Sequence, residues 1–379
     1  MSAVIAGFAR SPFTRAGKGE LSESRPDDIA ATVVNGLISK LNLDPSLIED
    51  IIVGTAFPEG EQGFNLGRMI TFLTDLPETV PGVTINRFCG SSMQAIHDAA
   101  GRIAIGAGEA FIAGGVESMS RIPMTGYNPM PNPKLSELYP EAFTSMGITA
   151  ENLASKYEIL RGDQEAFAVE SQSKANEASS SGLLSEEIVP IQISNGEVSK
   201  DGCIRAETNL ETLAGLNPVF LTQGSVTAGT SSPLTDGAAF VLVCSEEFAK
   251  ENELVPLAKI VSTAVSGCAP EMMGIGPVEA TRKALERANL SIEEIDVIEL
   301  NEAFAAQSIA VIRELGLDSS KVNLDGGAIA LGHPLGASGA RITGKAAQLL
   351  NRNGAKIALA TMCVGGGQGI ATILEKPGE

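Results

Sequence analysis

A repeat within the chain constrains its fold more than any other feature. Residues 43–57 read LDPSLIEDIIVGTAF and residues 290–304 read LSIEEIDVIELNEAF, so similar residues recur at an offset of 247 positions. The same offset pairs Ser91 with Ser338 and Ala113 with Ala360 without a gap. One constant register across two stretches indicates that the chain consists of two related halves.

Each half predicts the same series of elements. A polar helix (28–41; 278–289) precedes an apolar strand (51–57; 295–300), and a turn then opens a helix of small residues (90–105; 337–352) before a second strand (110–116; 357–363). Strands that alternate with helices are typical of βαβ units, so we expect an α/β fold with a largely parallel sheet.

The stretch between the two copies differs in character. It is rich in Met, Pro and Asn near MTGYNPMPNPKL, and it continues into a polar amphipathic helix expected near residues 149–180. A strand, FVLVC, is expected at 240–244. We therefore expect three parts: a first half (1–118 and 236–254), an inserted lobe (119–235) and a second half (255–379).

Charge and composition exclude several classes of protein. The 379 residues include 46 acidic and 27 basic side chains, a formal net charge of −19, which disfavours binding to nucleic acid. The five cysteines are widely spaced without a CxxC pair, as expected in a reducing compartment. No apolar stretch approaches the ~20 residues that a membrane span requires, so a cytoplasmic location is expected.

Cys89 is the first candidate for chemistry. It lies in NRFCGSSMQAIHDAA at the start of a predicted helix, where the helix dipole and free N–H groups favour the thiolate. A reactive nucleophile and a small buried core residue are both compatible with this position. His97 lies ~12 Å further along the same helix, too far to serve Cys89, and is interpreted as structural.

Two further candidates lie in the second half. His333, in DGGAIALGHPLGASGAR, occupies the turn equivalent to that of Cys89, because Cys89 pairs by offset with Gly336. If a pseudo-twofold axis relates the halves, the two turns face one crevice; the alternative is a histidine that only caps its turn. Asn301, beside Glu302 in NEAF, follows a predicted strand where ligands commonly bind, although a turn-forming Asn fits as well.

The segment CVGGGQG (363–369) lies between two predicted strands. It lacks the GxGxxG spacing and the following helix of a dinucleotide site, so NAD binding is rejected. Its backbone N–H groups are suited to an oxyanion hole beside a second thiol, Cys363; a plain tight hairpin remains the alternative.

Taken together, these segments resemble the thiolase family. NRFCGSSMQAIH, NEAFA, GGAIALGHPLGASGAR and CVGGGQG occur in the family's order, and GGVESMSRIPM, MGITAEN and GTSSPLTDGAA are similar to it too. The resemblance covers essentially the whole chain and implies a duplicated thiolase fold of five layers, α/β/α/β/α, with an inserted loop domain.

The resemblance also implies roles for individual residues. Cys89 would be the nucleophile, His333 would activate it and help to bind the thioester oxygen, and Asn301 would hold a water there. Cys363 would be the second acid/base, and the N–H groups of Cys89 and Gly365 would form the second oxyanion hole.

Substrates and partners follow from the same resemblance. CoA and acyl-CoA would be substrates, with no prosthetic group and no metal, and Arg205, Phe220 and Ser232 would contact CoA. A homodimer or tetramer and a possible β-oxidation multienzyme partner are expected. Ser145 stands where acetoacetyl-specific thiolases often carry His, which favours 3-oxoacyl-CoA of medium or longer chain.

The expected activity is therefore that of an acetyl-CoA C-acyltransferase, a 3-ketoacyl-CoA thiolase of the degradative type. The alternatives are a biosynthetic thiolase that forms acetoacetyl-CoA and a non-catalytic CoA- or lipid-binding protein of the same fold. An acyl-carrier-protein condensing enzyme commonly uses one Cys with two His, and here His97 is misplaced for that role.

Overall fold

The computed structural model describes residues 1–378 and contains a ten-stranded sheet, with helices between and around its two halves, and a separate two-stranded sheet. The strands are β1 (Ala3–Arg10), β2 (Thr14–Arg15), β3 (Asp50–Gly54), β4 (Gly82–Ile85), β5 (Ala110–Ser118), β6 (Ile191–Ile193), β7 (Gly196–Val198), β8 (Thr235–Ser245), β9 (Ala258–Gly267), β10 (Val297–Leu300), β11 (Ile357–Val364) and β12 (Gln368–Glu375). The helices are α1 (Pro26–Leu41), α2 (Leu66–Leu73), α3 (Ser91–Ala104), α4 (Pro133–Leu138), α5 (Met146–Lys156), α6 (Arg161–Ser180), α7 (Leu210–Ala214), α8 (Glu246–Glu251), α9 (Gly276–Ala288), α10 (Ala305–Leu315), α11 (Ala328–Leu331) and α12 (Leu335–Arg352).

The strand order repeats between the halves. The first half orders its strands β4-β3-β5-β8-β1 and the second β10-β11-β12-β9, so β3, β5, β8 and β1 correspond to β10, β11, β12 and β9. The halves meet where β1 pairs with β9 through Val4–Lys259 and Ile5–Ala258. This correspondence confirms the duplication that the 247-residue offset predicts.

The expectation of a largely parallel sheet is wrong. Among the described strands of the large sheet, the pairs β3–β4, β3–β5 and β10–β11 are parallel and the other pairs are antiparallel. A helical crossover makes two strands parallel, but β11 passes directly into β12 through a hairpin turn, which requires the antiparallel direction. The sheet is therefore mixed.

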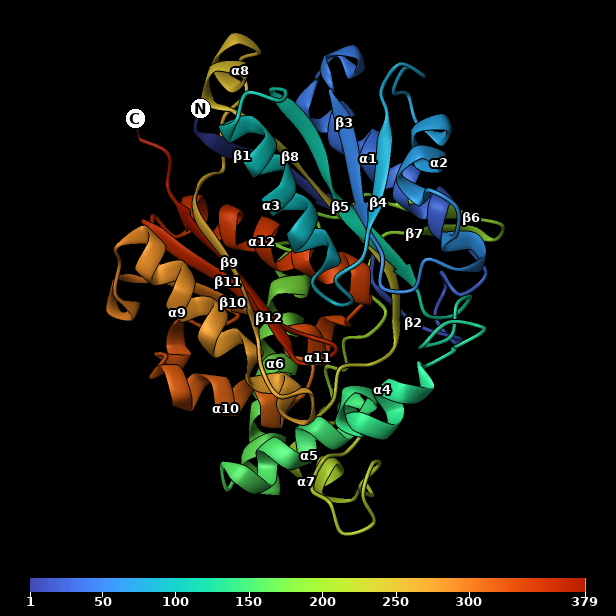
Figure 1. Cartoon of the computed structure of the whole chain (residues 1–379), viewed down its shortest axis with the longest axis vertical. Coiled ribbons are helices and arrows are strands. Elements are labelled where there is room, and N and C mark those ends of the chain that lie inside the picture. The colour runs from blue at the N-terminus through green and yellow to red at the C-terminus, as the bar shows by residue number, and fades with distance from the viewer. Residues whose placement is uncertain (379) are drawn as a thin grey trace.

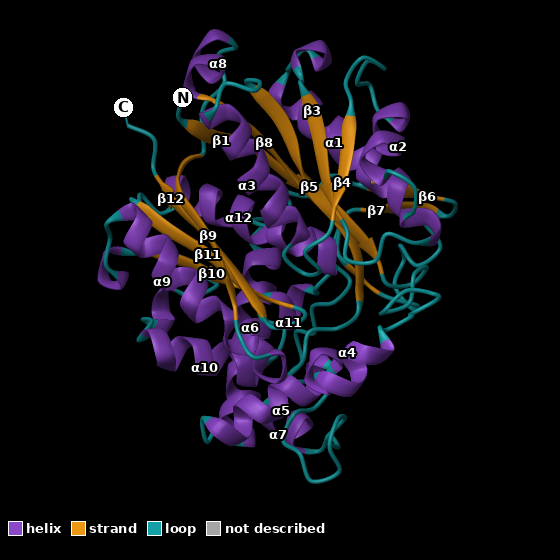
Figure 2. Cartoon of the chain, viewed as in Figure 1, coloured by secondary structure: helices purple, strands orange, loops and turns teal. Residues whose placement is uncertain are grey.

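Two helices of small residues fill the space between the half-sheets (Figure 2), and this arrangement gives the α/β/α/β/α layering. Helices α3 and α12 contact each other and strands of both halves, whereas α1 covers the outer face of the first half-sheet and α9 that of the second. A Cβ on Gly339 would lie 2.4 Å from the backbone N of Met93, so the two central helices pack too closely there for any side chain. Such contact explains the Gly- and Ala-rich sequence of α12.

The chain between β5 and β8 contains α4–α7 and the β6–β7 hairpin, with α4, α5 and α7 gathered at one end of the molecule (Figure 1). In the second half, the corresponding connection is only the short turn between β11 and β12. The single helix expected near 149–180 is in fact two, because α5 ends at Lys156 and Glu158 adopts a left-handed backbone with φ 50°. No helix within residues 1–378 combines the length and apolar character needed to cross a membrane.

Candidate active site

Cys89 lies in a strained turn between β4 and α3. Phe88, immediately before it, has φ 44°, a left-handed conformation that is rare for a bulky aromatic residue. Asn86 Oδ1 accepts a hydrogen bond from the Phe88 N–H at 2.7 Å, and Ser91 Oγ donates to the Phe88 carbonyl at 2.6 Å. These bonds hold the bend that precedes the thiol.

One cavity of about 220 Å³ brings the predicted residues together. It is lined by Cys89, Met119, Met124, Ser145, Met146, Gly147, Phe220, Ser231, Ser232, Pro233, Leu234, Met273, Ala303, Phe304, His333, Leu335 and Cys363. Thus residues from both halves and from the segment between them meet at one place, although up to 274 positions separate Cys89 from Cys363 along the chain.

Two of the three predicted CoA contacts line the cavity. Phe220 and Ser232 line the cavity; Phe220 packs edge-on against Phe304 with ring centroids 5.9 Å apart, and the Ser232 N–H donates to the Ala303 carbonyl. Arg205 does not line the cavity and is exposed to solvent.

The Cys89 sulfur receives hydrogen bonds from the N–H of Gly365 and from its own N–H, both of which lower its pKa. Burial is the larger effect and raises the pKa to about 12, with the Glu117 carboxylate adding to the rise. The local N–H groups favour the thiolate, as the position at the helix start predicts, but desolvation outweighs them in the resting site.

His333 is held in one tautomer. Its Nδ1 lies 2.6 Å from Ser338 Oγ, and that hydroxyl donates its only proton to the Pro334 carbonyl at 3.0 Å. Nδ1 is therefore the donor, which leaves Nε2 unprotonated with its lone pair as an acceptor. Burial, aided by the charge of Arg341, lowers the pKa of His333 to about 3, so the imidazole is neutral.

Asn301 joins the site through His333. Its Nδ2 lies 3.4 Å from His333 Nε2, while its Oδ1 is buried and accepts no hydrogen bond from any residue of the described chain. The amide group therefore has an unused acceptor beside the imidazole.

Cys363 is the second thiol of the cavity. It ends β11, is fully buried, and its pKa is raised first by burial and then by Cys89, so the two sulfurs lie within electrostatic reach of each other. Gly366 and Gly367, both at φ 75°, form the turn to β12. The segment 363–369 is thus a tight hairpin that also directs the Gly365 N–H at the Cys89 sulfur.

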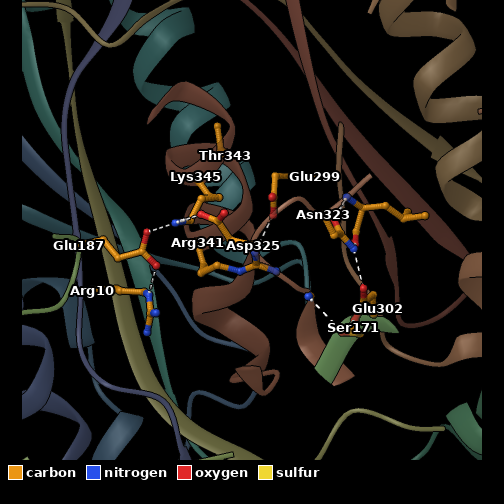
Figure 3. A network of polar contacts seen from close by, with 12 residues as sticks. Arg10, Ser171, Glu187, Glu299, Glu302, Asn323, Asp325, Arg341, Thr343 and Lys345 are labelled. Carbon is orange, nitrogen blue, oxygen red and sulfur yellow. Dashed lines mark hydrogen bonds and ion pairs between the residues drawn. The ribbon is translucent and has the colours of Figure 1, made fainter. Parts of the chain in front are cut away.

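A buried polar network joins α12 to β10 and to the loop that follows it (Figure 3). Arg341, one turn after Ser338 on α12, forms a fully buried ion pair with Glu299 of β10 at 2.6 Å, and Glu299 lies two residues before Asn301. The pair therefore joins the helix that carries Ser338 to the strand that leads to Asn301.

A second part of the network fixes the NEAF segment. Glu302 accepts hydrogen bonds from Ser171 Oγ of α6 at 2.6 Å, Asn323 Nδ2 at 2.8 Å and the Ile329 N–H at 3.1 Å (Figure 3). The segment between β5 and β8 is thereby tied to the loop that carries Asn301.

Sequence reasoning missed Ser338, Arg341 and Glu299 as parts of the site. The repeat held a signal for Ser338, because its partner by offset, Ser91, makes the equivalent bond to a carbonyl in the turn of Cys89. His97 lies apart from the cavity and bonds Thr372 Oγ1 at 2.8 Å.

Comparison with known proteins identifies the family. The model of the thiolase N-terminal domain matches residues 3–247 and that of the thiolase C-terminal domain matches residues 254–376. The chain belongs to the thiolase family.

Several thiolases resemble the whole chain. It is 46% identical over 386 residues to a 3-ketoacyl-CoA thiolase of Bacillus subtilis, covering 98% of this chain and 99% of the relative. A 3-oxoadipyl-CoA/3-oxo-5,6-dehydrosuberyl-CoA thiolase of Escherichia coli is 46% identical over 401 residues, with 99% of each chain covered. The crystal structure of the Bacillus anthracis acetyl-CoA acetyltransferase superimposes with a TM-score of 0.91 at 40% identity, over 99% of each chain.

Proposed function

We propose that this thiolase is an acetyl-CoA C-acyltransferase that cleaves 3-oxoacyl-CoA with CoA, giving acetyl-CoA and a shortened acyl-CoA in fatty-acid β-oxidation. The observation that carries the proposal is the convergence of two thiols and a neutral imidazole on one largely apolar cavity. The 46% identity to a 3-ketoacyl-CoA thiolase supports the same conclusion.

The first half-reaction uses Cys89 and His333. The lone pair of His333 Nε2 takes the thiol proton as the sulfur attacks the C3 carbonyl, and a tetrahedral oxyanion forms. The N–H groups of Gly365 and Cys89, which both lower the pKa of this sulfur, would stabilise negative charge on the adjoining oxygen.

Collapse of that intermediate breaks the C2–C3 bond, and its electron pair becomes the enolate of acetyl-CoA. Cys363 donates its proton to the enolate carbon. The acceptor at Asn301 Oδ1 and the imidazole are suited to hold a water against the thioester oxygen, where the enolate charge resides.

The second half-reaction regenerates the enzyme. CoA enters, the Cys363 thiolate takes the proton of its thiol, and the sulfur attacks the acyl–Cys89 thioester. The departing Cys89 sulfur recovers its proton from His333, so all protons balance and the kinetics are ping-pong. No step calls for a metal or a prosthetic group.

CoA binding and organisation complete the proposal. Phe220 and Ser232 would contact the pantetheine part of CoA, and the exposed guanidinium of Arg205 would meet a phosphate further out. The three parts would be 1–118 with 236–254, 119–235 and 255–379. A cytoplasmic homodimer or tetramer, with a possible β-oxidation multienzyme partner, remains our expectation.

A biosynthetic acetoacetyl-CoA thiolase is the second candidate, because the structural match to an acetyl-CoA acetyltransferase favours it. Steady-state thiolysis separates the two. We expect a higher kcat/KM for a medium- or long-chain 3-oxoacyl-CoA than for acetoacetyl-CoA, and strict preference for the four-carbon substrate would reject the degradative assignment. Loss of thiolysis in Cys89→Ser tests the mechanism itself.

A further inference from the structure

We propose that the wall of the cavity beside Cys89 selects uncharged acyl groups, so that the enzyme excludes 3-oxoacyl-CoA substrates whose chain ends in a carboxylate. Met119, Met124 and Leu335 are the specificity-determining residues. The inference rests on the proposed thiolase function and concerns the substrate class of the same site.

An apolar cluster packs against Cys89. Met119 and Leu335 form a buried cluster with Ala56, and Phe57 and Cys89 pack against it. Met124 continues the wall toward solvent with 43% of its surface exposed. None of the side chains that line the cavity within residues 1–378 is Lys, Arg, Asp or Glu.

The far end of a short acyl group bound to Cys89 would lie beside Met119, Met124 and Leu335. Cleavage of a six-carbon 3-oxo dicarboxylic substrate leaves a four-carbon acyl group on Cys89, and its free carboxylate lies only ~4–5 Å from the thioester carbon at ordinary bond lengths. A carboxylate so near the sulfur would lie beside the buried cluster of Ala56, Met119 and Leu335.

A buried carboxylate beside Cys89 opposes such a group. The buried Glu117 carboxylate already raises the pKa of Cys89 and accepts hydrogen bonds from the N–H groups of Ala56 and Gly336. Three basic residues lie close to this wall in the sequence. Both oxygens of Glu61 hold the guanidinium of Arg121, and Arg87 donates to Gln94 and Gln368. Arg15 precedes Ala16, which also packs on the cluster, and Arg15 is exposed to solvent. A second carboxylate at this place is therefore desolvated, repelled and unpaired.

The test compares two substrates of equal length. 3-Oxohexanoyl-CoA and 3-oxoadipyl-CoA differ only in a terminal methyl against a carboxylate, and kcat/KM is measured for each. We expect at least about 100-fold preference for the methyl substrate, the size that an unpaired buried charge implies. Comparable kcat/KM values for the pair would overturn the inference and leave the thiolase function intact.

A matched pair of variants at Met124 tests whether the missing positive charge in this wall sets the substrate preference. Met124→Arg places a cation at the open end, where it stays solvated, and should raise the ratio of kcat/KM for 3-oxoadipyl-CoA over 3-oxohexanoyl-CoA about tenfold or more. Met124→Leu should leave that ratio unchanged, and equal shifts in both variants would contradict the electrostatic argument. Turnover of neither substrate by the wild-type protein would instead refute the proposed function, and the inference with it.

Discussion

The resting thiol of Cys89 should be almost entirely protonated at neutral pH. With a pKa of about 12, roughly one sulfur in 10⁴ is a thiolate at pH 8, and the fraction rises tenfold per pH unit. The physical cause is desolvation in the apolar cavity, which two N–H groups offset only in part. A cysteine paired with a protonated histidine would instead be ionised already near pH 6.

The rate of alkylation distinguishes a protonated Cys89 thiol from a thiolate, because only the thiolate reacts. We expect the rate at which iodoacetamide modifies the Cys89 peptide, followed by mass spectrometry, to rise about tenfold per unit from pH 6 to pH 10 without a plateau. His333→Ala should show the same slope, because a histidine with a pKa of about 3 carries no charge over that range.

A plateau between pH 6 and pH 8 that disappears in His333→Ala would refute this reasoning. It would show that the resting enzyme holds a thiolate–imidazolium pair. His333 would then stabilise a charge that exists before substrate binds, in place of taking the proton during attack.

Three further predictions concern the surroundings of the thiol. Ser338→Ala should lower kcat about tenfold and leave KM nearly unchanged, since it frees the imidazole to adopt the other tautomer; an unchanged kcat would show that Ser338 does not set the tautomer. Arg341→Met should lower the free energy of unfolding by about 3–5 kcal/mol, because it leaves the buried Glu299 without its partner. The double variant Arg341→Met/Glu299→Leu should have a free energy of unfolding close to that of the wild type. Equal losses of stability in the single and double variants, measured by denaturant unfolding, would argue against the pairing. Cys363→Ser should retain acylation by acetyl-CoA better than exchange of its α-protons, both followed by mass spectrometry, and equal loss of the two would contradict separate roles.

The duplication was the most informative part of the sequence for the fold. A single offset predicted which strands and helices correspond, and the two half-sheets have the order that it implies. The strand directions were not predictable in the same way, because alternating elements determine the direction only where a helix connects the two strands. The break at Glu158 was also not predicted, because Glu is an ordinary helix-forming residue and its left-handed backbone appears only in the structure.

The site was predictable wherever chemistry depends on residue type and local position. Cys89, His333 and Cys363 were found from their turns, and the structure places all three on one cavity. The protonation of Cys89 was not predictable, because burial depends on residues distant in sequence. The Arg341–Glu299 pair escaped notice for the same reason, since its members lie on separate elements and form no motif.

Acylation by acetyl-CoA alone tests the central claim most directly. We predict that mass spectrometry of the mixed protein finds one acetyl group on Cys89 in the wild type and in Cys363→Ser, and none in Cys89→Ser. Absence of the adduct from Cys89, or its appearance on another cysteine, would contradict the assignment of this sulfur as the nucleophile.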